Sequence, residues 1–209
     1  PSERVRALLA EVEIEPGPDG PRPDPGWGEP GFSPAENVYA WNSFAVLAML
    51  AGTPESPVNA IQPEARAHCQ LRYIAGTDAD DILPGLRRHL DAHGFQAVAI
   101  EQAPEENRGG FEASRTDPDH PWALFVRRSL ERTSGRPPAV IPQMGGSICN
   151  ELFTDLLGLP AIWIPHSYTA CSQHAPDEHV LAPLCREALG LMAGLWWDLA
   201  EEAPARATG

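Results

Sequence analysis

The second half of the chain alternates helix-type and strand-type segments, and this order limits the possible folds more than any other feature. Apolar residues there recur at helical spacing or form short runs between turn residues. The expected segments are a helix at 122–133, a strand at 139–142, a helix at 148–157, a strand at 161–165 and a helix at 179–202. Strands that alternate with helices pair in parallel, because each connection crosses back over the sheet. We therefore expect an α/β layer over residues 105–209.

Residues 36–104 carry a different pattern, in which strands dominate. Between Ala65 and Tyr73 the side chains alternate between apolar and polar, which is typical of a strand with one buried face. Ile82, Leu86 and Leu90 predict a helix, and strands are expected from residue 58 and at 96–100. The sequence thus predicts an α+β unit here, with one sheet and helices on one side of it.

The first 35 residues form a Pro- and Gly-rich segment with a short helix expected at 2–12. Ser33 and Glu36 then have the spacing of a capping box, with proline at the first helical position. Residues 38–48 are apolar around most of a helical circumference. We therefore expect one largely buried helix from Pro34 to about Leu50.

The charge balance and the cysteines restrict the function classes. A count of 29 acidic against 15 basic residues gives a formal net charge of −14, which argues against binding to nucleic acid or to an anionic membrane. No apolar run reaches the roughly 18 residues of a membrane span, and no signal peptide is visible. The four cysteines form no C-x-x-C pair. These features predict a cytoplasmic protein with reduced thiols.

A glycine-rich loop follows the expected strand at 139–142. Gly145, Gly146 and Ser147 stand directly before an expected helix. Glycines allow close approach of a ligand to the backbone, and a helix start attracts anions. The loop is a candidate binding site for a carboxylate, and the alternative is a plain turn.

A second candidate lies at 166–179, after the expected strand at 161–165. It contains His166, His174 and His179 together with Asp177 and Glu178. Imidazole and carboxylate groups are the ligands that zinc and similar metals favour. The alternative is that residues 177–179 only cap and charge the start of the last helix. Of these residues, His174 is the better candidate for a metal ligand.

Further candidates are more isolated. Arg72, on the polar side of its strand, could bind a carboxylate through two parallel hydrogen bonds, or it could simply face solvent. Ser147 could act as a nucleophile with His166 or His174 as its base, and Cys171 is another conceivable nucleophile. No spacing in the sequence supports either nucleophile.

Three stretches together resemble the dinuclear-metal family of acetylornithine deacetylase, succinyl-diaminopimelate desuccinylase, glutamate carboxypeptidase and carnosinase. They occur in the family's order over roughly residues 36–202, as VNAIQPEARA with QLR at 58–72, GGSI at 145–148 and QHAPDE at 173–178. The resemblance implies the α/β fold class, with part of a ferredoxin-like lid followed by the C-terminal half of an aminopeptidase-like catalytic domain. The implied division is 1–35, 36–104 and 105–209.

The resemblance also implies roles for individual residues. His174 corresponds to a metal ligand, and Gly146 and Ser147 to a loop that binds the substrate. Arg72 is similar to the lid arginine that binds the substrate's carboxylate, and Asn59 to a lid residue that reaches an active site across a dimer. The implied cofactor is a divalent metal, zinc before cobalt or manganese, in a dinuclear centre. The implied partners are a carboxylate-bearing small molecule or peptide and a second copy bound through the lid.

The chain departs from the family at its catalytic core. The family's His-x-Asp pair, its Glu-Glu pair and a further carboxylate ligand have no counterpart here. In that chemistry the metals activate a water and a glutamate serves as general base. The sequence therefore predicts the C-terminal part of a metal-dependent amide or peptide hydrolase, inactive as this chain alone, with an N-terminal half as a conceivable separate partner. The alternative is a non-catalytic dimerisation module of the same fold.

Overall fold

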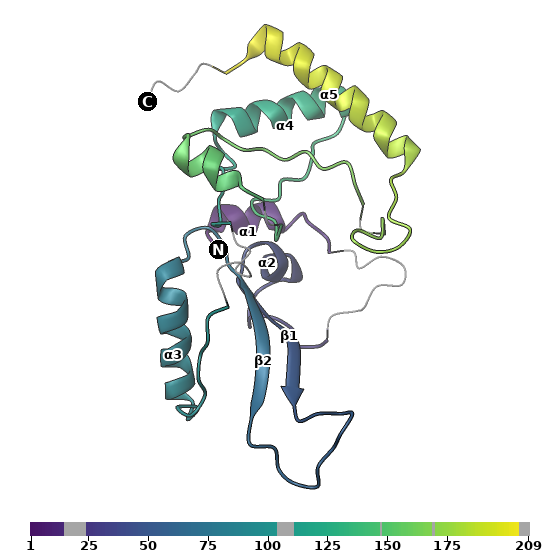
Figure 1. Ribbon diagram of the computed structural model, residues 1–209. Coiled ribbons are helices and arrows are strands. Elements are labelled where there is room, and N and C mark those ends of the chain that lie inside the picture. The colour runs from purple at the N-terminus through teal and green to yellow at the C-terminus, as the bar shows by residue number, and fades with distance from the viewer. Residues whose placement is uncertain (15–23, 104–110, 147, 169, 205–209) are drawn as a thin grey trace. The chain divides into compact units, whose positions relative to one another are not determined.

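The structure is a computed structural model that describes residues 1–14, 24–103, 111–146, 148–168 and 170–204 (Figure 1). The chain divides into two compact units. The first comprises Pro1–Ala40 and Ser114–Gly209, and the second comprises Trp41–Ala113. No helix of the described ranges is long and apolar enough to cross a membrane. We describe each unit by itself.

Two short helices open the first unit. Helix α1 (Glu3–Leu9) packs on α2 (Pro34–Tyr39), and Val5, Leu9, Ala35 and Ala40 form their common core. The expected capping box is confirmed, since Ser33 and Glu36 exchange side-chain and backbone hydrogen bonds. The backbone N–H of Ser33, and next the Arg6 guanidinium 2.9 Å away, lower the pKa of the buried Glu36 carboxyl.

The prediction that one helix continues to about Leu50 is wrong. Helix α2 ends at Tyr39, and strand β1 (Ser43–Ala51) follows. A run that is apolar on all sides suits a buried helix and a strand equally well, so periodicity alone does not separate them. In the structure, residues 43–51 form a strand because they pair with β2 (Ala65–Arg72). Just before this strand, the side-chain oxygen of Asn42 accepts a hydrogen bond from the N–H of Ile74 at 2.8 Å.

Strands β1 and β2 form an antiparallel ribbon in the second unit (Figure 1). Ser43 pairs with Arg72 and Ala51 with Ala65, with a bulge between Val46 and Ala48. Both faces of the ribbon are exposed along almost its whole length. Helix α3 (Ile82–Ala92), after the 3₁₀ turn η1 (Ala79–Asp81), forms as predicted but does not pack on the ribbon. The strands expected from residue 58 and at 96–100 do not form.

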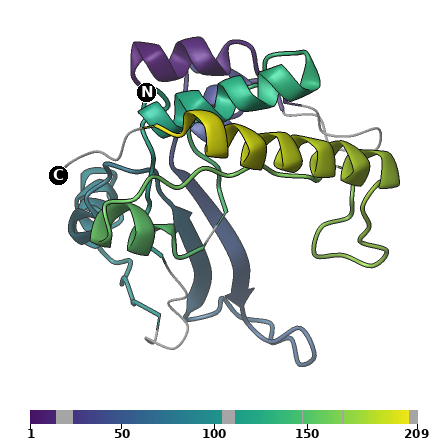
Figure 2. The ribbon, with the colours of Figure 1, turned by 90° about the horizontal axis from the view of Figure 1, so that it is seen from above.

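The long helices of the first unit are close to their predicted positions. Helix α4 (Pro121–Ser134) packs against α5 (Ala182–Glu202), and Figure 2 shows the two side by side. Phe125, Val126 and Leu195 form the core between them. Arg132 links the helices by ion pairs of 2.7 Å to Asp198 and 3.1 Å to Glu202.

The expected strands of this unit are not formed by the described residues. Residues 139–142 and 161–165 belong to no sheet, because β1 and β2 account for all strand pairing that the structure describes. The helix expected at 148–157 is reduced mainly to the π-helical segment η3 (Leu152–Leu156). Of the expected α/β layer, the described residues therefore form the helices α4 and α5 and no strand.

Candidate functional site

The loop that carries His174 has an unusual backbone. Ser172, His174 and Asp177 adopt left-handed conformations with φ of 59°, 62° and 65°, and they are the only non-glycine residues with positive φ in the described ranges. Such conformations cost on the order of 1 kcal/mol or more each, and they persist only where surrounding contacts enforce them. Backbone strain of this kind concentrates at functional sites. The strain coincides with the stretch singled out from the sequence as a candidate metal site.

Several contacts hold this loop. The N–H of His179 donates to the carbonyl of Cys171 at 3.0 Å and closes the loop at its base. The Tyr168 hydroxyl and Nε2 of His179 form a 2.5 Å hydrogen bond, and their rings meet edge to face. Cys171 is buried, and its sulfur accepts a hydrogen bond from the Ser167 hydroxyl at 3.2 Å. The loop is thus anchored at both ends.

The imidazole of His174 is left exposed by these contacts. Its backbone N–H points to the Glu178 carboxylate at 3.4 Å, whereas its ring makes no hydrogen bond to any residue that the structure describes. A free ring nitrogen on a fixed backbone is what a metal ligand requires. The role of His174 as a metal ligand stays a prediction, with which this geometry is consistent.

The other two histidines of the segment are placed differently. Both ring nitrogens of His179 are engaged, Nε2 with Tyr168 and Nδ1 with the carbonyl of Asp177 at 2.8 Å. His179 therefore holds the loop and does not offer a ligand atom. His166 is half-buried at the start of the loop. The loop presents one free imidazole on its strained part.

The view that residues 177–179 only cap the last helix is wrong. Helix α5 begins at Ala182, and its N-cap is Leu181, which makes no side-chain cap hydrogen bond. Asp177 instead lies in the left-handed conformation within the loop. The sequence gives no specific signal for the role of His179. Its partner Tyr168 lies eleven residues earlier, and a Tyr–His pair at that spacing is not typical of any particular structure.

The described residues do not assemble a metal site by themselves. Among them there is no group of three or more His, Cys, Asp or Glu side chains that could hold an ion. Zinc takes about four ligands, of which at least three come from protein side chains. The donors among the described residues therefore do not fit a complete metal centre, and His174 can supply one ligand.

The glycine loop is only partly described. Gly146 is exposed, and a side chain built there would meet nothing within 4 Å. No described atom thus blocks the approach of a ligand to Cα of Gly146. Ser147, proposed as a substrate-binding residue and as a nucleophile, lies outside the described residues. Cys171, the other conceivable nucleophile, is 4% exposed, and a buried thiol without a base is unreactive.

Asn59 and Arg72 belong to the second unit. Asn59 is exposed in the connection between β1 and β2, and Arg72 is the last residue of β2. Nε of Arg72 donates to the Gln70 side chain at 3.4 Å. Both side chains are on the surface, and their predicted contacts with substrate remain predictions.

Comparison with known proteins shows a relationship in fold. The amino-acid sequence matches no protein-family model and no curated protein sequence. The structure is similar to the M20 family metallo-carboxypeptidase Sso-CP2 from Sulfolobus solfataricus, with a TM-score of 0.66 and 20% identity over 93% of this chain and 44% of that chain. It is also similar to the di-peptidase Dug1p from Saccharomyces cerevisiae, with a TM-score of 0.64 and 15% identity over 98% of this chain and 43% of that one.

These similarities confirm the mixed α/β class predicted from the sequence. The chain spans less than half the length of the solved structures that it matches. At such identities the likeness concerns the fold, and both solved structures that share it are peptidases. The shared fold agrees with the fold that the motif resemblance implies, and it does not single out the particular family members named above.

Proposed function

We propose that this chain is one part of a metal-dependent hydrolase that cleaves an amide or peptide bond in an N-acyl amino acid or a small peptide. The observation that carries the proposal is the strained loop that presents the free imidazole of His174. The three ordered motifs and the fold shared with two peptidases support it. The chain alone is inactive, because one imidazole cannot hold a catalytic metal.

Each candidate residue has a definite role in this proposal. His174 provides one ligand to a divalent ion, zinc before cobalt or manganese. Gly146 and Ser147 bind the substrate through the loop backbone and hydroxyl, and the Arg72 guanidinium binds its carboxylate. Asn59 contacts substrate across a homodimer formed through the lid. The remaining ligands and the general base come from polypeptide outside residues 1–209.

The test compares the chain alone with the chain mixed with any polypeptide that the DNA upstream of Pro1 encodes. Hydrolysis of N-acyl amino acids and dipeptides is measured in the presence of zinc, together with bound metal. We expect activity only in the combined sample, and at least about a hundredfold loss in His174→Ala, since removal of a first ligand is more damaging than the 10–100-fold effect of an outer partner. His166→Ala, in the same loop, is the matched control. Unchanged activity and metal content in His174→Ala would refute the ligand assignment.

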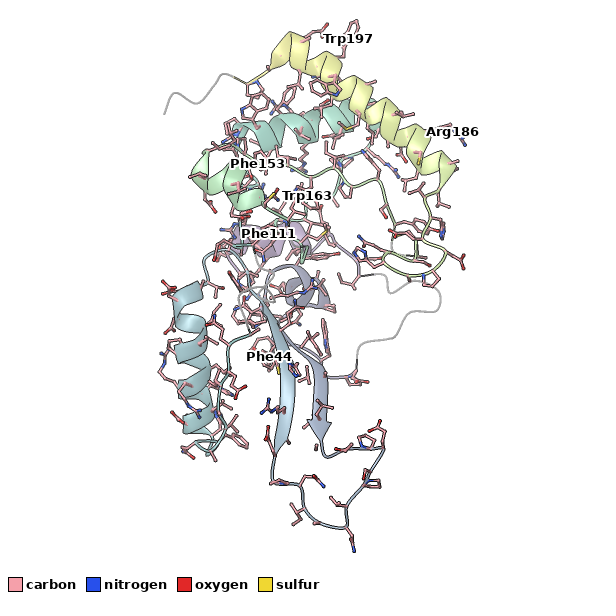
Figure 3. The ribbon with its side chains drawn as sticks, in the orientation of Figure 1. Phe44, Phe111, Phe153, Trp163, Arg186 and Trp197 are labelled. Carbon is pink, nitrogen blue, oxygen red and sulfur yellow. The ribbon has the colours of Figure 1, made fainter. Side chains whose placement is uncertain are left out.

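A second candidate function is a non-catalytic dimerisation module. It is favoured by the exposed apolar side chains of the ribbon, among which Phe44 is 57% and Met49 72% exposed. Figure 3 shows Phe44 on the ribbon. An apolar strand without cover is a pairing surface. A stable homodimer that binds no zinc and hydrolyses nothing, even with the upstream polypeptide, would favour this module over the hydrolase.

A further inference from the structure

Two histidines lie side by side at the end of helix α3, which Figure 1 labels. His89 belongs to the last turn of the helix and His93 is its C-cap residue, and both are exposed. Residues four apart on a helix are neighbours on its surface. The two rings are accordingly adjacent, with centroids 4.2 Å apart and planes inclined by 34°. The end of α3 thus presents a pair of imidazoles to solvent.

A hydrogen bond determines which nitrogen of His93 is available to a ligand. Nδ1 of His93 lies 2.8 Å from the carbonyl oxygen of His89. Because a carbonyl oxygen can only accept, the neutral ring carries its proton on Nδ1 and keeps a lone pair on Nε2. Metal-ligating histidines usually donate their other ring N–H in this way. Neither Nε2 of His93 nor the ring of His89 makes a hydrogen bond to a residue that the structure describes.

The backbone that carries the pair is held by the end of the helix. The N–H of His93 donates to the carbonyl of His89 at 3.2 Å, and the N–H of Phe95 donates to the carbonyl of Leu90 at 2.8 Å. Gly94 has a φ of 84°, the left-handed conformation that commonly ends a helix. The two histidines therefore have fixed backbone positions, and only their side chains need to move to share a ligand.

The spacing of the rings suits one shared metal ion. With metal–nitrogen bonds of about 2.0–2.1 Å, two imidazoles on one ion place their ring centres roughly 4.5–5 Å apart. The observed separation of 4.2 Å is slightly shorter. A small rotation of the side chains closes this difference, and exposed side chains rotate within nanoseconds.

The charges around the pair also favour a cation. The neighbouring arginines of α3 are neutralised by ion pairs, Arg87 with Asp91 at 2.7 Å and Arg88 with Asp81 at 2.6 Å. The formal net charge of −14 attracts cations to the chain as a whole. A single histidine at a helix C-terminus is explained by the helix dipole. That explanation does not require the second imidazole beside it.

We propose that His89 and His93 bind one divalent late transition-metal ion, with Cu²⁺ bound most tightly. Imidazole ligands suit copper, nickel and zinc, and nitrogen sites bind Cu²⁺ most strongly in this series. The described residues contain no group of three donor side chains, so the protein supplies two ligands and water completes the shell. Copper in tetragonal geometry accepts such mixed nitrogen and oxygen ligands. The inference does not rest on the proposed function, because the two sites share no residue.

The test titrates the whole chain with Cu²⁺ in a buffer that does not bind metals. Calorimetry measures the affinity, and electron paramagnetic resonance identifies the ligands. We expect a site with a dissociation constant of about 10 μM or tighter and a signal from two nitrogen ligands. His89→Ala and His93→Ala should each weaken this site at least about tenfold, because one imidazole is left. His68→Ala, which removes an exposed histidine of β2, should leave it unchanged within about twofold.

A double variant tests the spacing of the histidines separately from their number. Arg88→His combined with His89→Ala keeps the number of imidazoles but places them five residues apart, away from the shared face. It also removes a positive charge, which by itself favours a cation. A loss of affinity of at least about tenfold is therefore expected from the spacing alone. Circular dichroism checks that every variant keeps its helix content.

Several results would overturn the inference. One is equally tight binding in His89→Ala, in His93→Ala or in the double variant. Another is a loss of the same size in His68→Ala. A site weaker than about 10 μM in the original chain would also overturn it. The proposed function is tested through His174 and is affected by none of these results.

Discussion

Tyr168 and His179 hold the loop that contains the three left-handed non-glycine residues of the described ranges. Their hydrogen bond joins the start of the loop to its end, and the three left-handed residues lie between them. A loop with such conformations would relax to ordinary ones without these anchors. The two side chains therefore determine where the His174 imidazole is presented.

Tyr168→Phe is expected to loosen this loop. It removes one hydrogen bond, worth about 1 kcal/mol, and should lower the melting temperature by about 2–4 °C. Amides at 171–179 should exchange faster, which mass spectrometry can measure. Tyr39→Phe removes a hydroxyl that makes no hydrogen bond in the described structure, and it serves as the control. Equal effects of the two variants would show that the Tyr168 hydroxyl does not hold the loop.

The contacts of single residues could be predicted from the sequence only in part. The capping box at Ser33 and Glu36 follows from local chemistry, and the structure contains it. The choice of His174 over its neighbours rested on a motif, and the structure adds that its ring is free and that of His179 is engaged. That difference depends on where Tyr168 lies, which no local pattern contains.

At the scale of elements, helices were predicted more reliably than strands. Helices α3, α4 and α5 follow apolar spacing along one segment, and their hydrogen bonds are internal. A strand depends on a partner, so β1 was mistaken for a helix because its apolar run has no period. For the same reason residues 161–164 keep the side-chain pattern of a strand without its pairing.

The crossing of α4 and α5 provides a test at this scale. A methyl group at Gly194 would overlap the Thr133 side chain, so Gly194→Ala should destabilise the protein by about 1–3 kcal/mol. Gly190, one turn earlier, has nothing within 4 Å, and Gly190→Ala should stabilise by about 0.5–1 kcal/mol. Urea unfolding followed by tryptophan fluorescence measures both. A stable Gly194→Ala variant would contradict the close packing.

For the whole molecule, net charge and exposed apolar surface have opposite effects on the association of two copies. The chain carries a formal net charge of −14, and its ribbon exposes large apolar side chains such as Met49. The predicted homodimer through the lid must overcome the repulsion between two acidic chains. Ionic strength should therefore control its stability.

We expect the homodimer to become tighter as salt is added. The Debye length falls from about 30 Å at 0.01 M to about 10 Å at 0.1 M, so the repulsion is screened while the apolar contact persists. Sedimentation at both salt concentrations measures the dimer fraction. Met49→Lys, at an exposed apolar site of β1, should abolish the dimer, whereas Glu55→Lys in the connecting loop should not. A dimer that dissociates on addition of salt would indicate an interface held by ion pairs.

The Thr116 hydroxyl limits how much of residues 161–164 can pair as a strand. It occupies both hydrogen-bonding groups of Ala161, so that edge is closed at one end. At the other end Pro165 has no N–H to offer. Backbone pairing of this segment with another strand is thereby confined to the three residues Ile162–Ile164.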